Sequence, residues 1–279
     1  MKHKGWIALD IDGTITDNIN SIPKEVVTYL ETLHDEGWKL FFITGRTFAF
    51  GHNALKALGV PYYFAVQHGA DILEMPSKKL ISRSYLTDKT IAILEDAYTH
   101  EKEDFVIYSG YAEGDFCYYR PKKFSKEFLD YLVLLKNLTP EPWKAVESFD
   151  FEKGLEFPLI KCIGTEEKMM RLHDLLSKHA DLHVTLIKDP ISRKHYLNLV
   201  TSAKATKGHA LERIIALTQE RGKVIAAGDD LNDITMLDVA DIAIGMETGP
   251  EELKNHADII AASASKLGII DALKEAVRK

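Results

Sequence analysis

The sequence is poor in cysteine, which limits both its crosslinks and its metal chemistry. Only Cys117 and Cys162 occur in 279 residues. Two thiols are too few for a disulfide framework or a cysteine zinc site, and each lies in an apolar stretch where free thiols are commonly buried. We therefore expect a reduced, cytoplasmic protein.

Long hydrophobic runs are also lacking. No apolar run approaches the roughly 18 residues that a membrane-spanning helix requires. The first run, residues 6–9, is interrupted at Asp10, well short of the roughly 7 to 15 apolar residues of a signal peptide. The sequence predicts neither a membrane span nor a secretory leader.

Positive charge is in deficit, with 35 Lys and Arg against 42 Asp and Glu and a formal net charge of −7. Nucleic acids and anionic membranes are bound mainly by basic side chains that neutralise phosphates. Neither is therefore an expected partner. Charge alone also argues against a phosphorylated substrate.

What the sequence does contain is a regular alternation of buried strands and helical stripes at both ends of the chain. A length of about twice the usual domain size predicts two domains. Short, continuous apolar runs are typical of strands covered on both faces of a parallel sheet. These runs are residues 6–11, 39–44, 62–66, 224–228, 241–245 and 258–262. The pattern predicts an α/β, doubly wound (Rossmann-like) core with its ligand at the carboxyl ends of the strands.

In the middle of the chain the predicted order of elements differs, with paired strands joined by short turns. We expect strands at 105–109, 115–120, 157–164, 183–188 and 195–200, and helices at 88–100, 124–138 and 166–179. Such an order predicts an antiparallel α+β module. We therefore divide the chain into a discontinuous core, residues 1–84 and 201–279, and an inserted α+β cap, residues 85–200.

The first buried strand ends in Asp10-Ile-Asp12-Gly13-Thr14. A chain that turns at Gly13 can aim one carboxylate and one carbonyl at a single point. Such a pair supplies a nucleophile with a proton donor, or hard oxygen ligands for Mg²⁺. Asp-x-Asp also occurs as a simple loop cap, so this motif alone leaves both interpretations open.

The second buried strand ends in Thr44-Gly45-Arg46. A hydroxyl and free backbone N–H groups suit the oxygens of a phosphoryl group, and glycine allows close approach. A plain turn with a surface arginine is the alternative.

A later strand ends in Gly228-Asp229-Asp230-Leu231-Asn232-Asp233. Three carboxylates in five residues repel one another unless a cation compensates, which favours a divalent metal over a helix N-terminus enriched in Asp. Lys207, at a predicted helix start, is disfavoured by the helix dipole. It either faces anions or is simply solvated.

Together these four segments resemble the motifs of the haloacid dehalogenase superfamily of aspartyl-phosphate phosphatases. They are 10–14, 43–46, 207–208 and 228–233, in the superfamily's order. The insert lies between the second and third motifs and is similar to a type IIB (C2B) cap. The chain is thereby identified as a member of the Cof-type subfamily, which acts on sugar phosphates and related metabolites.

The resemblance implies a role for each motif residue. Asp10 is the nucleophile and Asp12 the proton donor and acceptor, while Lys207 neutralises charge and orients Asp10. Mg²⁺ is held by Asp10, the Asp12 carbonyl, Asp229 and a supporting Asp233. The implied phosphoryl contacts are Thr44, Gly45, Arg46 and Asn232.

Other positions depart from the family pattern or belong to the insert. His68 stands where relatives usually carry Asn, and we interpret it as a packed or surface side chain. In the cap, Arg193, His195 and Asn198 are candidate substrate contacts, with exposed strand residues as the alternative.

We expect a Mg²⁺-dependent phosphatase of a sugar phosphate, a phosphorylated cofactor or a precursor of one. A phosphomutase of the phosphomannomutase type and a phospho-acceptor signalling domain are the alternatives. The expected partner is a small-molecule phosphomonoester, with no nucleic acid or membrane, and the expected state is a monomer or small homo-oligomer.

Overall fold

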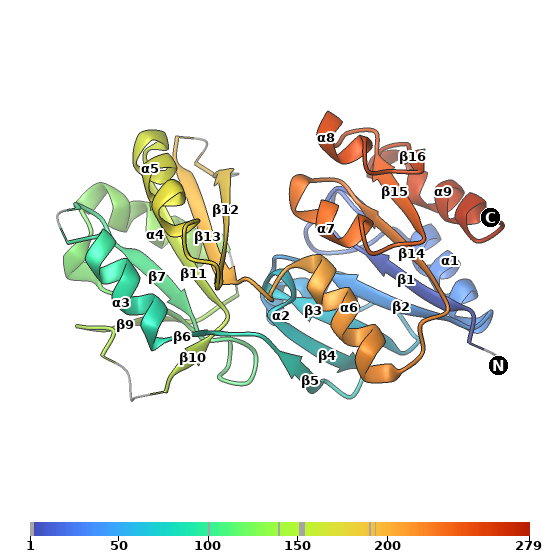
Figure 1. The fold of residues 1–279 in the computed structure, drawn as a ribbon, viewed down its shortest axis with the longest axis horizontal. Coiled ribbons are helices and arrows are strands. Elements are labelled where there is room, and N and C mark those ends of the chain that lie inside the picture. The colour runs from blue at the N-terminus through green and yellow to red at the C-terminus, as the bar shows by residue number, and fades with distance from the viewer. Residues whose placement is uncertain (1–2, 100, 139, 151–153, 190, 193) are drawn as a thin grey trace. The chain divides into compact units, whose positions relative to one another are not determined.

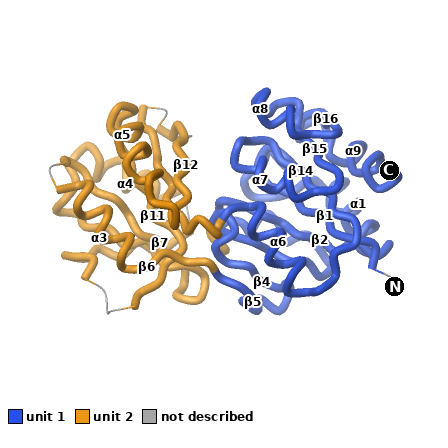
Figure 2. The backbone as a smooth tube through the Cα atoms, in the orientation of Figure 1, with its two compact units in different colours: residues 1–46, 50–83, 206–279 blue, residues 47–49, 84–205 orange. Residues whose placement is uncertain are grey.

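The structure is a computed structural model of the chain, and it describes residues 3–99, 101–138, 140–150, 154–189, 191–192 and 194–279 (Figure 1). The chain forms two compact units (Figure 2). The first comprises Met1–Arg46, Phe50–Arg83 and Thr206–Lys279, and the second comprises Thr47–Ala49 and Ser84–Ala205. Both units are therefore discontinuous in sequence.

A single eight-stranded sheet forms the centre of the first unit. Its strands in spatial order are β16 (Ile259–Ala261), β15 (Ile242–Met246), β14 (Lys223–Gly228), β1 (Gly5–Leu9), β2 (Trp38–Ile43), β3 (Tyr62–Val66), β4 (Asp71–Met75) and β5 (Lys79–Arg83). The strands from β16 to β3 are parallel, whereas β4 and β5 form an antiparallel hairpin at one edge. The six predicted parallel strands are confirmed, and the edge hairpin is additional.

Helices cover both faces of this sheet. They are α1 (Lys24–Asp35), α2 (Phe48–Leu55), α6 (Lys207–Thr218), α7 (Ile234–Leu237), α8 (Glu251–Lys254) and α9 (Gly268–Ala276), with 3-10 turns η1 (Gln67–Gly69), η3 (Leu231–Asp233) and η4 (Ala264–Lys266). On one face, α6 and α7 pack against alternate residues of β1, β2 and β14 (Figure 1). On the other face, α1 contacts β2 and α9 contacts β15 and β16. Burial on both faces explains why the strands read as continuous apolar runs.

The strand order decides where the chemical motifs meet. β1 lies between β14 and β2, and all three run parallel. Their carboxyl ends therefore share one edge of the sheet, and the residues that follow them are brought together there. Those residues are the first, second and fourth motifs of the sequence.

The second unit is an antiparallel sheet with helices on both faces. Its strands in spatial order are β12 (Leu182–Lys188), β13 (Tyr196–Ser202), β11 (Leu159–Gly164), β7 (Phe105–Tyr108), β8 (Cys117–Tyr119) and β9 (Trp143–Ala145), and β6 (Leu86–Thr87) pairs separately with β10 (Glu156–Phe157). Pairing is antiparallel except between β8 and β9. The helices are α3 (Asp88–Ala97), α4 (Lys126–Leu138) and α5 (Glu166–Leu176), with the 3-10 turn η2 (Pro121–Lys123).

Strand alternation divides the interior of this unit into two apolar layers. Phe105, Ile107 and Cys162 face α3 and α5, whereas Val106 and Ile163 face α4. The predicted fold class, an α/β core with an α+β insertion, is confirmed. Within the described residues, no helix has both the length and the apolar character that crossing a membrane requires.

Candidate active site

Asp10 follows β1 directly and remains tied to the sheet. Its backbone N–H donates to the Ala227 carbonyl at 3.0 Å, so the strand geometry continues one residue past β1. The residue is only 4% exposed. The hydroxyl of Thr14 lies 3.4 Å from Asp10 Oδ2, at the limit of a hydrogen bond. A carboxylate is thus held at the centre of the sheet edge.

Lys207 compensates part of the charge of this carboxylate. It is the first residue of α6, whose N-cap Thr206 accepts a hydrogen bond from the His209 N–H. The Lys207 Nζ lies 2.6 Å from Asp10 Oδ1 and 2.6 Å from Asp233 Oδ1. Lys207 is 3% exposed, so both ion pairs are shielded from water. Of the two sequence-based interpretations, the structure supports the lysine that faces anions.

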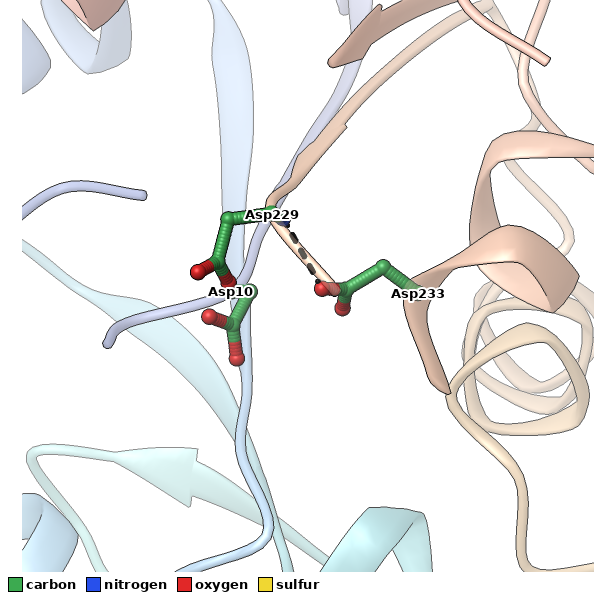
Figure 3. Close-up of side chains that lie close together, drawn as sticks. All are labelled: Asp10, Asp229 and Asp233. Carbon is green, nitrogen blue, oxygen red and sulfur yellow. Dashed lines mark hydrogen bonds between the residues drawn. The ribbon is translucent and has the colours of Figure 1, made fainter. Parts of the chain in front are cut away.

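Asp233 is fixed by hydrogen bonds on both of its oxygens. Its Oδ2 accepts from the backbone N–H groups of Asp229 at 3.0 Å and Asp230 at 3.1 Å, and its Oδ1 accepts from Lys207. Figure 3 shows the bond to the Asp229 backbone beside the paired carboxylates of Asp10 and Asp229. Asp233 therefore shapes the loop after β14 and orients the lysine.

Asp10, Asp229 and Asp233 together form an acidic triad (Figure 3). Each offers one carboxylate oxygen, and these three oxygens lie within 4.8 Å of one another. Three carboxylates against one ammonium leave a net charge of −2 in a largely buried space. Among the described residues no donor satisfies the Asp229 carboxylate, although Asp10 and Asp233 have partners. These features fit a small divalent cation with oxygen ligands.

The electrostatics of the triad are strongly perturbed. Burial, with the nearby Asp233, raises the pKa of Asp10 from 3.8 to about 7 despite the opposing effect of Lys207. Burial and the charges of Asp10 and Asp233 raise the pKa of Asp229 to about 8. Burial alone would lower the pKa of Lys207, but the two adjacent carboxylates outweigh it and raise that pKa. Each shift reflects anions crowded into a poorly solvated site.

Asp12 lies on the turn after Asp10, and its side chain is 52% exposed. Arg46, which follows β2, donates from Nε to Asp12 Oδ2 at 2.8 Å and from Nη2 to Asp12 Oδ1. The two motifs are therefore joined through a bidentate ion pair. The sequence placed both residues at the site but did not predict this pairing.

Thr44 and Gly45 complete the loop after β2. Thr44 is buried, and its Oγ1 accepts the Arg46 N–H at 3.1 Å. Gly45 is in close contact with His68, because a Cβ built on Gly45 would lie 2.7 Å from His68 Cε1. The imidazole thus packs on this loop, which agrees with the interpretation of His68 as a packed side chain.

The remaining candidate substrate contacts differ in how far the structure supports them. Asn232 lies in η3, and its buried Oδ1 has no partner among the described residues. Asn198 is fully buried in β13 and donates to the Met169 carbonyl at 2.7 Å, a packing position that gives no access to a ligand. The expectation that Asn198 contacts substrate is therefore withdrawn. Arg193 lies outside the described residues, and His195 packs between Phe128 and Tyr131.

Two contributors had no role assigned from the sequence. Thr14 lies against Asp10, and Thr206 caps the helix that presents Lys207. Thr206 followed by His209 has the spacing of an N-cap, so this signal was present in the sequence. The Thr14 contact depends on the turn at Gly13, which no short-range pattern specifies.

Comparison with known proteins decides the family. The family model described as haloacid dehalogenase-like hydrolase matches residues 7–273. The chain belongs to the haloacid dehalogenase-like hydrolase family. The predicted superfamily is confirmed, and the four motifs lie at the strand ends and the helix start where the sequence placed them.

Relatives within this family match along nearly their whole length. Phosphatase YwpJ of Bacillus subtilis is 23% identical over 291 residues, which cover 96% of this chain and 98% of that protein. The 5-amino-6-(5-phospho-D-ribitylamino)uracil phosphatase YwtE of the same organism is 24% identical over 285 residues, covering 94% of each. A solved subclass IIB sugar phosphatase superposes with a TM-score of 0.73 at 22% identity, covering 98% of both chains. This last likeness establishes a shared haloacid dehalogenase fold.

Proposed function

We propose that the chain is a Mg²⁺-dependent phosphatase of small phosphorylated metabolites that acts through an aspartyl phosphate on Asp10. The observation that carries this proposal is the buried Asp10 carboxylate, paired with Lys207 and grouped with Asp229 and Asp233. A structural ion pair alone would not require three converging carboxylates. The phosphatase names of the YwpJ and YwtE relatives support the same reaction class.

The reaction divides into two displacements at phosphorus. An Asp10 oxygen attacks, the P–O bond to the alcohol breaks, and Asp12 gives its proton to the departing alkoxide. A water molecule then attacks the phosphorus of the aspartyl phosphate, and Asp12 takes a proton from that water. Inorganic phosphate leaves and Asp10 is regenerated. Lys207 neutralises negative charge and holds Asp10 in place throughout.

The acidic triad is suited to a resident Mg²⁺. The Asp10 carboxylate, the Asp12 carbonyl and Asp229 would hold it, with Asp233 in support through water. Such an ion would neutralise the phosphoryl charge that otherwise repels an attacking carboxylate. Few protein ligands suit Mg²⁺, which keeps several of its waters.

The phosphoryl oxygens would be bound on the side of the β2 loop. Thr44 offers a hydroxyl and Gly45 a backbone N–H, while Asn232 offers an amide whose Oδ1 has no other partner among the described residues. Positioning and charge stabilisation supply most of the catalysis in phosphoryl transfer. These contacts are accordingly assigned to orientation.

We infer that residues 85–200 choose the substrate and that residues 1–84 and 201–279 carry out the chemistry. The relatives named above suggest two classes to test first, sugar phosphates and phosphorylated ribitylaminouracils. A cytoplasmic location, with both cysteines free and buried, is part of the same proposal.

Phosphate release from a broad monoester panel tests the proposal directly. Wild-type protein should release inorganic phosphate from at least one sugar phosphate or cofactor precursor with Mg²⁺, and should stop when the metal is chelated. Asp10→Asn should be inactive on every substrate. No release from the whole panel, or full activity in Asp10→Asn, would contradict the proposal. Isomer interconversion without net release would instead favour a phosphomutase.

A further inference from the structure

The guanidinium of Arg46 is held on three sides. Its Nε and Nη2 form a fork on the two oxygens of Asp12, and its Nη1 donates to the Ile19 carbonyl at 2.6 Å. Its Cζ lies 4.3 Å from the centre of the Phe50 ring, which covers one face of the guanidinium plane. Arg46 is 8% exposed. The group is therefore fixed in position and orientation.

The backbone of Arg46 is equally constrained. Its N–H donates to Thr44 Oγ1 at 3.1 Å, and its carbonyl accepts the Gln67 N–H at 2.8 Å. Gln67 and His68 have left-handed φ values of 49° and 60°, which cost energy for residues other than glycine. The turn after β3, which is itself strained, thus holds the backbone of Arg46 in place.

This arrangement occupies the part of Arg46 that would bind a phosphoryl group. Arginine recognises carboxylates and phosphates through the same planar fork of two parallel N–H donors. Here that fork is bonded to Asp12. A phosphoryl group could use it only by displacing the Asp12 carboxylate.

We propose that Arg46 is a positioning residue that acts through Asp12: its fork fixes the Asp12 side chain in one orientation, and it does not itself bind the phosphoryl group. The inference rests on the proposed function, because it takes Asp12 as the group that transfers protons. It revises the expectation that Arg46 is a phosphoryl contact. An exposed carboxylate without such a partner would sample several rotamers, and each excursion would remove the proton donor from the leaving group.

Leaving-group dependence separates the two roles. The aryloxide of an aryl phosphate is a good leaving group and departs without protonation. The alkoxide of an alkyl phosphate is a poor leaving group and needs a proton donor. The ratio kcat/KM reports the steps up to leaving-group release, so slow hydrolysis of the aspartyl phosphate does not mask the difference. If Arg46 acts through Asp12, Arg46→Lys should lower kcat/KM for an alkyl monoester by about 10²-fold, within the range of general acid catalysis, and should change p-nitrophenyl phosphate by only a few-fold.

Arg46→Lys is the primary variant because it keeps the charge at a buried position but cannot form the fork. Arg46→Met is the second variant, and circular dichroism melting checks that both fold. Arg221→Met is the matched control, since Arg221 pairs with Asp241 at 2.8 Å on the exposed surface of the same unit. The control should leave kcat/KM unchanged for both substrates.

A double-mutant cycle completes the test. On the alkyl ester, Asp12→Ala combined with Arg46→Met should be no slower than Asp12→Ala alone, because the two residues act as one unit. Calorimetric titration of Mg²⁺-loaded protein with inorganic phosphate gives a readout independent of turnover. The Kd for phosphate should stay within about threefold in Arg46→Met, since no phosphate ligand is lost.

Equal losses on both esters, multiplicative losses in the cycle, or a phosphate Kd weakened by more than about tenfold would overturn the inference, because each is expected of a lost bidentate phosphate contact. Full activity of Arg46→Lys on the alkyl ester would overturn the requirement for a fork. Any of these results in an active wild-type protein contradicts the inference alone. A wild-type protein without Mg²⁺-dependent phosphate release contradicts the proposed function and the inference together.

Discussion

Lys207 is the residue on which the electrostatic balance of the site depends. Its Nζ lies 2.6 Å from a carboxylate oxygen of both Asp10 and Asp233, and all three side chains are almost completely buried. Removing one member of a buried ion pair leaves an uncompensated charge in a medium that solvates it poorly. Lys207 is thus expected to matter for both stability and catalysis.

Lys207→Met should therefore have two measurable effects. The free energy of unfolding of the metal-free protein should fall by about 3 kcal/mol, as for other broken buried pairs. The kcat/KM with Mg²⁺ should fall by roughly 10²–10³-fold because a preorganised positive charge is lost. Denaturant unfolding and steady-state kinetics measure these changes. Lys266→Met, which breaks the exposed pair with Glu247, is the control, and equal effects in both variants would refute the assignment.

The raised pKa values of Asp10 and Asp229 predict a pH-dependent affinity for Mg²⁺. These groups have pKa values of about 7 and about 8 without metal. Protons therefore compete with the metal near neutral pH, and binding should release protons. Isothermal titration between pH 6 and pH 9 should show affinity that rises with pH. An affinity that is constant over this range would contradict the prediction.

The same shifts predict how the stability of the metal-free protein depends on pH. Both carboxyls bind protons more tightly in the folded chain than in the unfolded chain, where the value is 3.8. Their contribution to stability is therefore complete below about pH 3.8, decreases as pH rises above that value, and is lost once pH has passed about 7 to 8. Thermal melting in EDTA should show this decrease, and added Mg²⁺ should reverse it.

At the scale of elements, the turn after β1 carries a requirement for glycine. Gly13 has φ +73°, and a Cβ at this position would lie 2.0 Å from Asp229 Oδ2. The turn can approach the acidic loop after β14 only because no side chain intervenes. A metal ligand from each loop can therefore share one point.

Gly13→Ala should separate backbone strain from this close approach. We expect a loss of stability of about 1 kcal/mol or more together with a weaker affinity for Mg²⁺, because Asp229 is displaced. Gly154→Ala is the matched control, since Gly154 has φ +93° but nothing within 4 Å of its Cβ position. Gly154→Ala should lose stability but keep its affinity for Mg²⁺. Unchanged Mg²⁺ affinity in Gly13→Ala would show that this approach is unimportant.

The sequence predicted most elements of the fold because their patterns are local. Apart from Lys39 and Lys223 near their starts, the buried strands β1, β2 and β14 are apolar, since helices cover both faces of the sheet. The strand β9 was not predicted, because its three residues are too few to show any period. The sequence also predicts a helix through residues 53–58, and the helix found there, α2, begins earlier, at Phe48, and ends at Leu55.

The site was predictable in its residues but not in their pairings. Motif positions at strand ends were enough to bring Asp10, Asp229 and Asp233 together. The fork between Arg46 and Asp12 spans 34 positions in the chain and depends on two loop conformations. The prediction for Asn198 failed because β13 is buried on both faces. A residue in the middle of this strand therefore has no side chain exposed to a ligand. Short-range sequence patterns therefore do not predict contacts that depend on the geometry of loops.

At the scale of the whole molecule, each of the two compact units shown in Figure 2 has its own buried ion pair. In the second unit Arg120 donates to both oxygens of Asp104 at 2.7 Å and lies 4.1 Å from the centre of the Phe149 ring. This ion pair is remote in sequence from the acidic triad. It provides a way to perturb one unit without touching the other.

Arg120→Met should destabilise the second unit by about 3 kcal/mol or more, because it leaves Asp104 buried without a partner. The affinity of the acidic triad for Mg²⁺ should not change. Hydrogen exchange resolved by peptide, together with Mg²⁺ titration, measures both effects. Arg171→Met, at an exposed pair with Glu101, is the control. A parallel loss of Mg²⁺ affinity would show that the units do not act separately.

The net charge of −7 is not spread evenly over the chain. Part of the excess is concentrated in the acidic triad, where Lys207 compensates only one of three carboxylates. When all three carboxyls are ionised, the site has a formal net charge of −2 and repels a phosphate monoester until a divalent cation neutralises it. The overall acidity is unfavourable for binding polyanions but is compatible with a phosphorylated metabolite.

The central claim, that Asp10 is the nucleophile of a phosphatase, is tested most directly by finding where phosphate is attached during turnover. Wild-type protein mixed with an active monoester and Mg²⁺ is quenched in acid, digested and analysed by mass spectrometry. We predict one phosphoryl group on the peptide that contains Asp10, absent without Mg²⁺ and absent in Asp10→Asn, which should also release no phosphate. A phosphoryl group on a different residue, or undiminished turnover by Asp10→Asn, would contradict the account.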